Sequence, residues 1–278
     1  MIIDFHTHTF PDRIAAAAMS KMEKSAHAKA FADGTRDSLL RMMQNAGVAH
    51  AVVLPVATKP MACASLNDAS HVLDGRDQLT YFAAIHPDAP DWHAELGRAK
   101  TQGFRGVKLH PVYQGVDIDD PRFVRILARC GELGLMVVMH GGEDISYPGV
   151  ARCSPPMLRR ALAQAGPVTL IAAHMGGWRN WQEGPEMLLD TGVYLDTSFT
   201  LGDICPLDDH YKPEQLKMLA DERFCELVHI FGSKRVLFGT DSPWYDPAVC
   251  IERIRSMPLT DTEKKDILGD NARQLLGL

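Results

Sequence analysis

Two histidines separated by one residue stand at the end of the chain's first apolar segment. His6 and His8 close the run Ile-Ile-Asp-Phe-His-Thr-His, residues 2–8, which otherwise has the composition of a buried strand. Side chains two positions apart on a strand point to the same side, so the two imidazoles lie side by side while Thr7 faces the opposite way. Imidazole nitrogens are common ligands of divalent metals. The pattern is also consistent with two hydrogen-bonded histidines of the core. Whether His6 and His8 bind a metal therefore depends on the rest of the chain.

Other polar side chains end later apolar segments in the same way. They are Lys108 and His110 in residues 104–111, His140 in 135–142, His174 in 168–177 and Asp241 in 235–244. One buried histidine is usually a hydrogen-bonded core group. If they converge on one place, His6, His8, His140, His174 and Asp241 together form a ligand set for a divalent metal such as Zn²⁺. The sequence therefore predicts a metal site, provided that the fold brings these segment ends together.

Eight short apolar runs, rich in Val, Ile, Leu and aromatic residues, carry these side chains. They cover residues 2–8, 50–56, 79–87, 104–111, 135–142, 168–177, 193–199 and 235–244. Such near-continuous hydrophobicity is typical of parallel strands covered on both faces. Segments with helical periodicity lie between them, at residues 37–47, 121–134, 155–166 and 213–232, and a last candidate helix closes the chain.

This alternation predicts an α/β fold, a single (β/α)8 TIM barrel that forms one domain over residues 1–278. A doubly wound open sheet has the same local pattern. Eight strands, with no G-x-G-x-x-G after the first, favour the barrel. Because the active site of such a barrel forms at the carboxyl ends of its strands, the polar side chains are expected to meet there.

Composition narrows the class of partner. The net charge is 29 − 35 = −6, which does not favour binding to nucleic acid or to an anionic membrane. The six cysteines are scattered without a C-x-x-C pair, which argues against a disulfide framework and a zinc finger. No apolar run approaches the 18 or so residues of a membrane span. These features predict a cytoplasmic protein that acts on a small-molecule substrate.

Several local motifs are similar to those of one family. They are GVKLHP (106–111), MHGG (139–142), AHMGGW (173–178), YLDTS (194–198), LFGTDSPW (237–244) and GDNARQLLGL (269–278). With the His-x-His pair, they make the whole chain resemble the metal-dependent amidohydrolase superfamily. The branch it resembles is amidohydrolase-2, which includes aminocarboxymuconate-semialdehyde decarboxylase and related hydrolases, hydratases and decarboxylases.

The resemblance implies a role for each strand-end residue. His6, His8, His140 and Asp241 are similar to the ligands of one metal, usually zinc, and His174 to the residue that hydrogen-bonds the water or substrate. Metal coordination lowers the pKa of water toward ~7, which gives a nucleophile at neutral pH. A carboxylate such as Asp241 can accept the proton, and His174 can polarise a carbonyl, so these two are the expected catalytic residues.

Lys108 and His110 have more than one interpretation. In binuclear relatives the corresponding lysine is carboxylated and bridges two metals, whereas a free Lys108 can bind a substrate carboxylate or form an internal ion pair. We expect a free lysine and a single Zn²⁺, and two ions only if Lys108 is carboxylated. His110 is expected to contact the substrate or act as an acid, or else to support another residue by a hydrogen bond.

Loops after the strands carry further candidates. Trp178 and Arg152 are expected to line a pocket for a planar or carboxylated substrate, although packing or a subunit interface explains them equally well. Asp196 and Ser198 share one face of their strand and are expected to orient a ligand histidine.

These residues predict a metal-dependent hydrolase of a small amide, lactone or ester. The alternative is a non-oxidative decarboxylase or hydratase of a small carboxylated substrate at the same metal site. Nuclease relatives carry a glutamate in a GEIGLD-like motif where this chain has GVKLHP, so a nuclease is not expected. The complete ligand set argues against a binding scaffold. Because the decarboxylase relatives form dimers, the resemblance also implies a homodimer.

Overall fold

The computed structural model describes residues 1–182 and 184–278, and the chain falls into two compact units. Unit 1 comprises Met1–Val53, Ile145–Pro148 and Asp196–Leu278, and unit 2 comprises Leu54–Asp144 and Gly149–Leu195. The expectation of a single domain over residues 1–278 stays a prediction.

The strands of unit 1 are centred on β1 (Ile2–Thr7), which pairs in parallel with β2 (Val48–Val53). The other side of β1 lies beside β11 (Val236–Leu237) and the residues that follow it, because the Phe5 amide donates to the Phe238 carbonyl at 2.8 Å. The Thr197 amide donates in turn to the Leu237 carbonyl at 3.0 Å. The carboxyl ends of β1 and β11 and the residues around Asp196 are thereby brought together.

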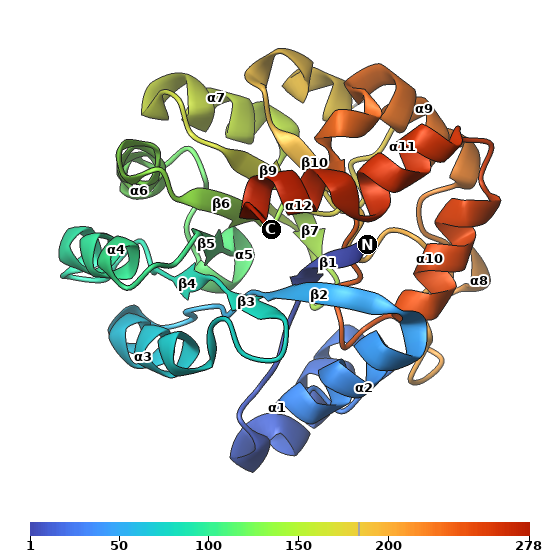
Figure 1. The fold of residues 1–278 in the computed structure, drawn as a ribbon, viewed down its shortest axis with the longest axis horizontal. Helices are drawn as coiled ribbons and strands as arrows, with labels where there is room; N and C mark the ends of the chain where they lie inside the picture. The colour runs from blue at the N-terminus through green and yellow to red at the C-terminus, as the bar shows by residue number, and fades with distance from the viewer. Residues whose placement is uncertain (183) are drawn as a thin grey trace. The chain divides into compact units, whose positions relative to one another are not determined.

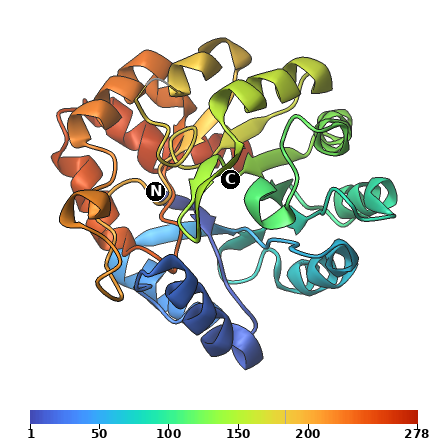
Figure 2. The same cartoon turned by 180° about the vertical axis from the view of Figure 1, so that it is seen from behind.

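Unit 1 also contains helices. They are α1 (Asp12–Ala26), α2 (Arg36–Ala46), α8 (Pro213–Leu216), α9 (Asp221–Phe231), α10 (Pro247–Ser256), α11 (Asp261–Lys265) and α12 (Asn271–Leu276), with a 3-10 turn η3 (Ser233–Arg235) and a π-helical turn η4 (Asp266–Asp270). Helices α1 and α2 run next to each other (Figures 1 and 2).

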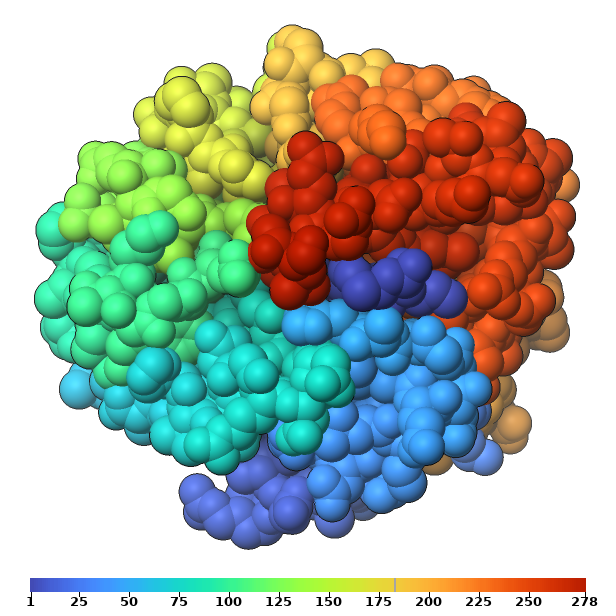
Figure 3. Space-filling model, viewed as in Figure 1, coloured from blue at the N-terminus to red at the C-terminus, as the bar shows by residue number. Residues whose placement is uncertain are grey.

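The amino terminus of unit 1 lies against its carboxyl-terminal segment. In Figure 3 the dark blue N-terminal residues lie between the red C-terminal segment and the light blue residues of β2. A Cβ added to Gly269 would stand 2.0 Å from the Met1 carbonyl oxygen, so this contact requires glycine. Element η4 packs against β1 and β11, and α12 also contacts β1.

The strands of unit 2 form a parallel ladder. Its order is β4 (Ala83–Ala84), β5 (Gly106–Leu109), β6 (Met136–Met139), β9 (Leu170–Ala172) and residues Tyr194–Leu195 of β10 (Tyr194–Asp196), with β3 (Leu79–Tyr81) preceding β4 in the chain. Strands β4, β5, β6 and β9 are buried along their whole length, as expected of parallel strands covered on both faces. A separate two-stranded sheet consists of β7 (Gly142–Asp144) and β8 (Tyr147–Cys153).

The helical segments of unit 2 follow in chain order. They are η1 (Pro60–Ala62), α3 (Cys63–Leu73), α4 (Trp92–Thr101), the short α5 (Pro111–Gln114), α6 (Pro121–Leu133), α7 (Pro155–Ala165) and the 3-10 segment η2 (Pro185–Thr191). Figures 1 and 2 show α3, α4, α6 and α7 following one another along the outside of the ladder. Helix α6 shows why the boundaries fall where they do: the Asp120 side chain caps its first turn, Pro121 begins it and left-handed Gly134 ends it.

All eight predicted strand ranges contain or overlap strands of the structure, in the predicted order. The hairpin of β7 and β8 was not predicted, because the Gly, Pro and charged residues of 142–153 hide its alternation. The predicted helix over residues 213–232 is divided, since Lys217 has extended backbone and separates α8 from α9. Within the described residues, no helix has both the length and the apolar character that a membrane crossing requires.

Candidate metal centre

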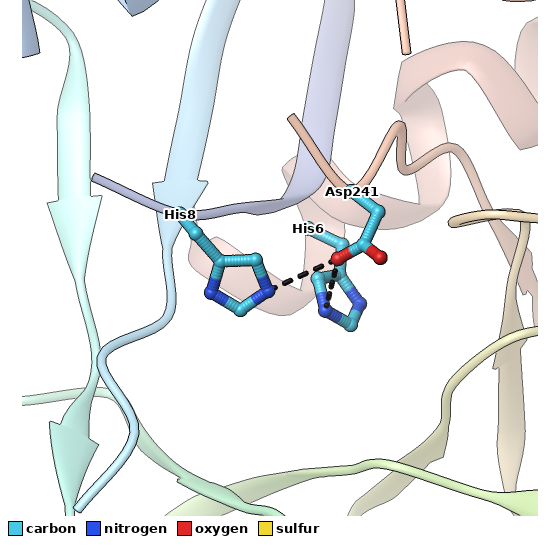
Figure 4. Close-up of side chains that lie close together, drawn as sticks. All are labelled: His6, His8 and Asp241. Atoms are coloured by element: carbon cyan, nitrogen blue, oxygen red, sulfur yellow. Dashed lines mark hydrogen bonds and ion pairs between the residues drawn. The ribbon is translucent and has the colours of Figure 1, made fainter. Parts of the chain in front are cut away.

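Two histidines and an aspartate of unit 1 meet at the carboxyl end of β1. Nε2 of His8 lies 3.0 Å from Oδ1 of Asp241, and Nε2 of His6 lies 3.4 Å from the same oxygen. Figure 4 shows one ring nitrogen of each histidine directed at this oxygen. The rings stand 70° apart, with centroids separated by 5.1 Å. Ligand atoms of the types that Zn²⁺ prefers therefore converge on one point.

Backbone hydrogen bonds set this arrangement. The Asp241 amide donates to the His6 carbonyl at 2.9 Å, and the His8 amide donates to the Ser242 carbonyl at 2.7 Å. The two segments lie close together at Gly239, where an added Cβ would stand 2.8 Å from the His6 Cβ. The sequence Gly-Thr-Asp after β11 thus brings Asp241 up to the histidine pair.

Asp196 holds the ring of His6 from behind. Its Oδ2 lies 2.8 Å from Nδ1 of His6, and both side chains are buried. Its Oδ1 accepts hydrogen bonds from the amide of Ser198, at 3.0 Å, and from the Ser198 hydroxyl. The contact that the sequence predicted between Asp196 and a strand-end histidine is therefore present.

This donor set fits a divalent metal. With Asp196 accepting from Nδ1–H of His6, the lone pair of that imidazole is on Nε2, the atom that faces Asp241. The His6 side chain is 1% exposed, whereas those of His8 and Asp241 are 19% and 13% exposed. An ion held here would be anchored on the buried side by His6 and reached from the side of His8 and Asp241.

Asp4 belongs to the same region and was not predicted. It is buried, and its carboxylate accepts hydrogen bonds from the His6 amide at 3.2 Å, the Thr240 amide at 3.0 Å and the Thr240 hydroxyl at 2.5 Å. Burial raises the pKa of Asp4 to about 7, against the lowering effect of these bonds. Its parity with His6 and His8 on β1 is the signal from which it could have been found.

Unit 2 holds a second cluster. Nε2 of His174 lies 2.9 Å from Nδ1 of His140, and the His110 ring stacks between those of Tyr113 and His140, with centroids 3.8 Å away on each side. Asp144 lies 3.6 Å from Nε2 of His110. Asp144 was not predicted, although an acidic residue soon after a strand end was a signal for it.

The stacking of the rings determines whether this second cluster can bind a metal ion. His110, His140 and Asp144 offer ligand atoms within 4.8 Å of one another. The rings of His110 and His140 are within 14° of parallel, however, so their in-plane lone pairs do not converge on one ion. The cluster is a group of stacked and hydrogen-bonded side chains.

Burial is the main influence on the pKa of His140 in this cluster. It lowers the pKa of His140 well below the usual value, and the neighbouring His110, His174 and Lys108 add to the effect. Lys108 lies on β5 and is 1% exposed. His140 is therefore neutral, the form in which an imidazole binds a metal.

The two predicted pocket residues differ in their surroundings. Trp178 is buried after β9, where its amide donates to the Gly141 carbonyl at 2.9 Å and the Arg179 guanidinium lies over its ring. Arg152 is on β8 and donates to Asp117 at 2.8 Å with both side chains partly exposed. Contact of either residue with substrate stays a prediction.

Unit 1 thus brings together three of the four predicted metal ligands, His6, His8 and Asp241. His140 and His174 are hydrogen-bonded to each other within unit 2. The participation of His140 as fourth ligand, and of His174 in catalysis, stay predictions.

Comparisons with known proteins agree with the resemblance. The sequence model of the family described as amidohydrolase, the amidohydrolase-2 group, matches residues 3–278. The chain is 25% identical over 202 residues to 2-amino-3-carboxymuconate-6-semialdehyde decarboxylase of Dictyostelium discoideum, a match that covers 63% of this chain and 54%, about half, of that relative.

Solved structures show the fold. A TIM-barrel protein of Bordetella bronchiseptica matches with a TM-score of 0.76 at 18% identity, covering 99% of this chain and 98% of the other. A 2,6-dihydroxybenzoate decarboxylase, in complex with 2,6-dihydroxybenzoate, matches with a TM-score of 0.70 at 15% identity, covering 100% and 99%. The predicted TIM-barrel fold is therefore confirmed.

Proposed function

Because the chain belongs to the amidohydrolase family, a family of metal-dependent enzymes, we propose that it removes CO2 non-oxidatively from a small carboxylated substrate. In this proposal one divalent metal, Zn²⁺, is bound by His6, His8 and Asp241, with His140 as the fourth ligand that the sequence predicts. The observation that carries the proposal is the convergence of the two Nε2 atoms on Oδ1 of Asp241.

The residues of unit 1 have different roles in this proposal. Asp196 keeps Nδ1 of His6 protonated, so the lone pair that binds the metal is on Nε2. When bound, a divalent metal acts as a Lewis acid that polarises substrate oxygens. Asp241, partly exposed beside the two histidines, is placed to hold and transfer a proton.

In decarboxylation, this proton is transferred to the substrate carbon that loses its carboxylate. The bond between the substrate carbon and its carboxylate breaks, and the electron pair stays on the carbon. That carbon takes one proton from the protein and CO2 leaves, so neither an oxidant nor a reductant is needed. We assign the proton delivery to Asp241.

Two lines support decarboxylation over the hydrolysis that the sequence alone favoured. The curated relative and one solved structure with the same fold are named as decarboxylases. Lys108 and Arg152, which the sequence predicts to bind substrate, have basic side chains, and basic side chains pair with carboxylates.

Hydrolysis of an amide, lactone or ester is the second candidate. It is favoured by Asp241, whose carboxylate can accept a proton from an attacking water as readily as deliver one to carbon.

The test is a paired substrate screen of the zinc-loaded protein. One panel holds aromatic and olefinic carboxylates labelled with ¹³C at the carboxyl group, followed by mass spectrometry of released CO2. The other holds esters, lactones and amides, followed by acid release in a pH-stat. We expect CO2 from at least one carboxylate, lost on chelation and restored by Zn²⁺. Turnover confined to the second panel would establish the hydrolase, and none in either panel from protein that holds its metal would refute both candidates.

A further inference from the structure

Asp241 has a backbone conformation that L residues rarely adopt. Its φ is +60°, in the left-handed region that favours glycine. A side chain at such a position persists only where the surrounding contacts hold it. The residues on either side of Asp241 show what these contacts are.

Thr240, which precedes Asp241, is tied to β1 by two hydrogen bonds. Its amide donates to Oδ1 of Asp4 at 3.0 Å, and its hydroxyl donates to Oδ2 of Asp4 at 2.5 Å. The same Oδ1 also accepts from the His6 amide at 3.2 Å. One buried carboxylate therefore joins the backbone at His6 to the residue before Asp241.

Ser242, which follows Asp241, is held by the same hydroxyl. The Ser242 amide donates to Oγ1 of Thr240 at 3.0 Å, across the turn that contains Asp241. The Thr240 hydroxyl is thus donor to Asp4 and acceptor from Ser242. Both Asp4 and Thr240 are buried, so water does not replace these partners.

We propose that Asp4 and Thr240 are positioning residues for the metal centre. They hold Asp241 in the left-handed conformation that places its Oδ1 between His6 and His8. Neither touches the metal or the substrate, and their effect is exerted through Asp241. This inference rests on the proposed metal centre. It adds the two residues that hold the carboxylate ligand Asp241 in its binding conformation.

Thr240→Val and Thr240→Ser form the matched pair that tests it. Valine keeps the shape of the side chain and loses the hydroxyl, whereas serine keeps the hydroxyl and loses the methyl group. The Zn²⁺ dissociation constant is measured on the metal-free full chain by competition with a chromophoric chelator, and the visible spectrum of the Co²⁺-substituted protein reports the ligand geometry. We expect about a 10- to 100-fold weaker affinity and an altered Co²⁺ spectrum for Thr240→Val, both restored in Thr240→Ser.

Asp266→Asn is the control for a general loss of stability. Asp266 is a buried carboxylate of unit 1 that accepts from the Ser233 hydroxyl and from Lys234, away from the centre. Its replacement is expected to lower the melting temperature and leave the Zn²⁺ affinity unchanged. A folded Thr240→Val protein with wild-type affinity and spectrum would overturn the inference. A wild-type chain that binds no Zn²⁺ would instead overturn the proposed function.

Discussion

Nδ1 of His6 lies 2.8 Å from Oδ2 of Asp196, and neither side chain is more than 1% exposed. A carboxylate in this position accepts a hydrogen bond from the protonated ring nitrogen, so the lone pair of the imidazole is on the other nitrogen. The lone pair is thereby on Nε2, the nitrogen on the side of Asp241. The pair links the strand that carries Asp196 to the first strand of the chain, 190 residues away.

The first prediction is that Asp196→Asn weakens the metal affinity. An asparagine can present its amide NH2 to Nδ1, which would place the imidazole proton on Nε2 and remove the ligand lone pair. We expect a loss of about 10- to 100-fold in Zn²⁺ affinity, measured by chelator competition.

An exposed copy of the same contact provides the control. Oδ2 of Asp208 also lies 2.8 Å from Nδ1 of His27, but both side chains are more than a third exposed. Asp208→Asn is expected to bind Zn²⁺ as wild type does. Equal affinities for the two variants would show that Asp196 does not set the tautomer of His6.

The second prediction concerns Asp241→Asn, which keeps the shape of the side chain but can neither carry the proton nor offer a charged oxygen. Turnover is expected to fall by at least about 10²- to 10⁴-fold, the range of general acid–base catalysis, with an unchanged far-UV circular dichroism spectrum. Turnover near the wild-type rate in a protein that retains its metal would remove Asp241 from the proton-transfer step.

The third prediction compares two glycine-to-alanine changes. A Cβ at Gly239 would stand 2.8 Å from the His6 Cβ, whereas one at Gly97, within α4, meets nothing within 4 Å. We expect Gly239→Ala to lower the free energy of unfolding by about 1–3 kcal/mol through overpacking and to weaken Zn²⁺ binding. Gly97→Ala is expected to stabilise by about 0.5–1 kcal/mol. Urea unfolding measures both, and equal stabilities would contradict the close packing at Gly239.

The fourth prediction is that His140 makes the free energy of unfolding of the metal-free protein fall at acid pH. Its pKa is lowered in the folded chain by burial, and then by His110, His174 and Lys108. Below the unfolded value of about 6.5, the unfolded chain binds a proton that folded His140 does not. Stability is therefore lost as the pH falls below 6.5, at up to about 1.4 kcal/mol per pH unit for one proton.

Urea unfolding at pH 7.5 and 5.0 in the presence of a chelator measures this effect. The difference in unfolding free energy between the two pH values is expected to be smaller in His140→Asn than in wild type. The exposed His93→Asn variant is the control and should leave the difference unchanged. An unchanged difference in His140→Asn would mean that this imidazole titrates normally.

Much of the centre was predictable because strand parity and strand ends are visible in a sequence. The spacing of His6 and His8 indicated a shared face, and the apolar run before Asp241 indicated a strand end. Asp4 has the same parity, yet a lone carboxyl early in a strand gives no sign that Thr240 will meet it 236 residues later.

Other features were hidden for different reasons. Asp144 lies in a hairpin whose Gly, Pro and charged residues mask strand periodicity. The pairing of Arg152 with Asp117 depends on a contact that spacing does not encode. The left-handed backbone of Asp241 had only a weak local signal, since aspartate adopts this region more often than most residues but neither it nor its neighbours Thr240 and Ser242 is glycine.

The most direct test of the central claim is anomalous diffraction at the zinc absorption edge from crystals of the zinc-loaded protein. The account predicts a peak bonded to Nε2 of His6, Nε2 of His8 and a carboxylate oxygen of Asp241, at distances near 2.0–2.2 Å. A zinc-saturated crystal whose anomalous peaks all lie away from these three side chains would contradict it.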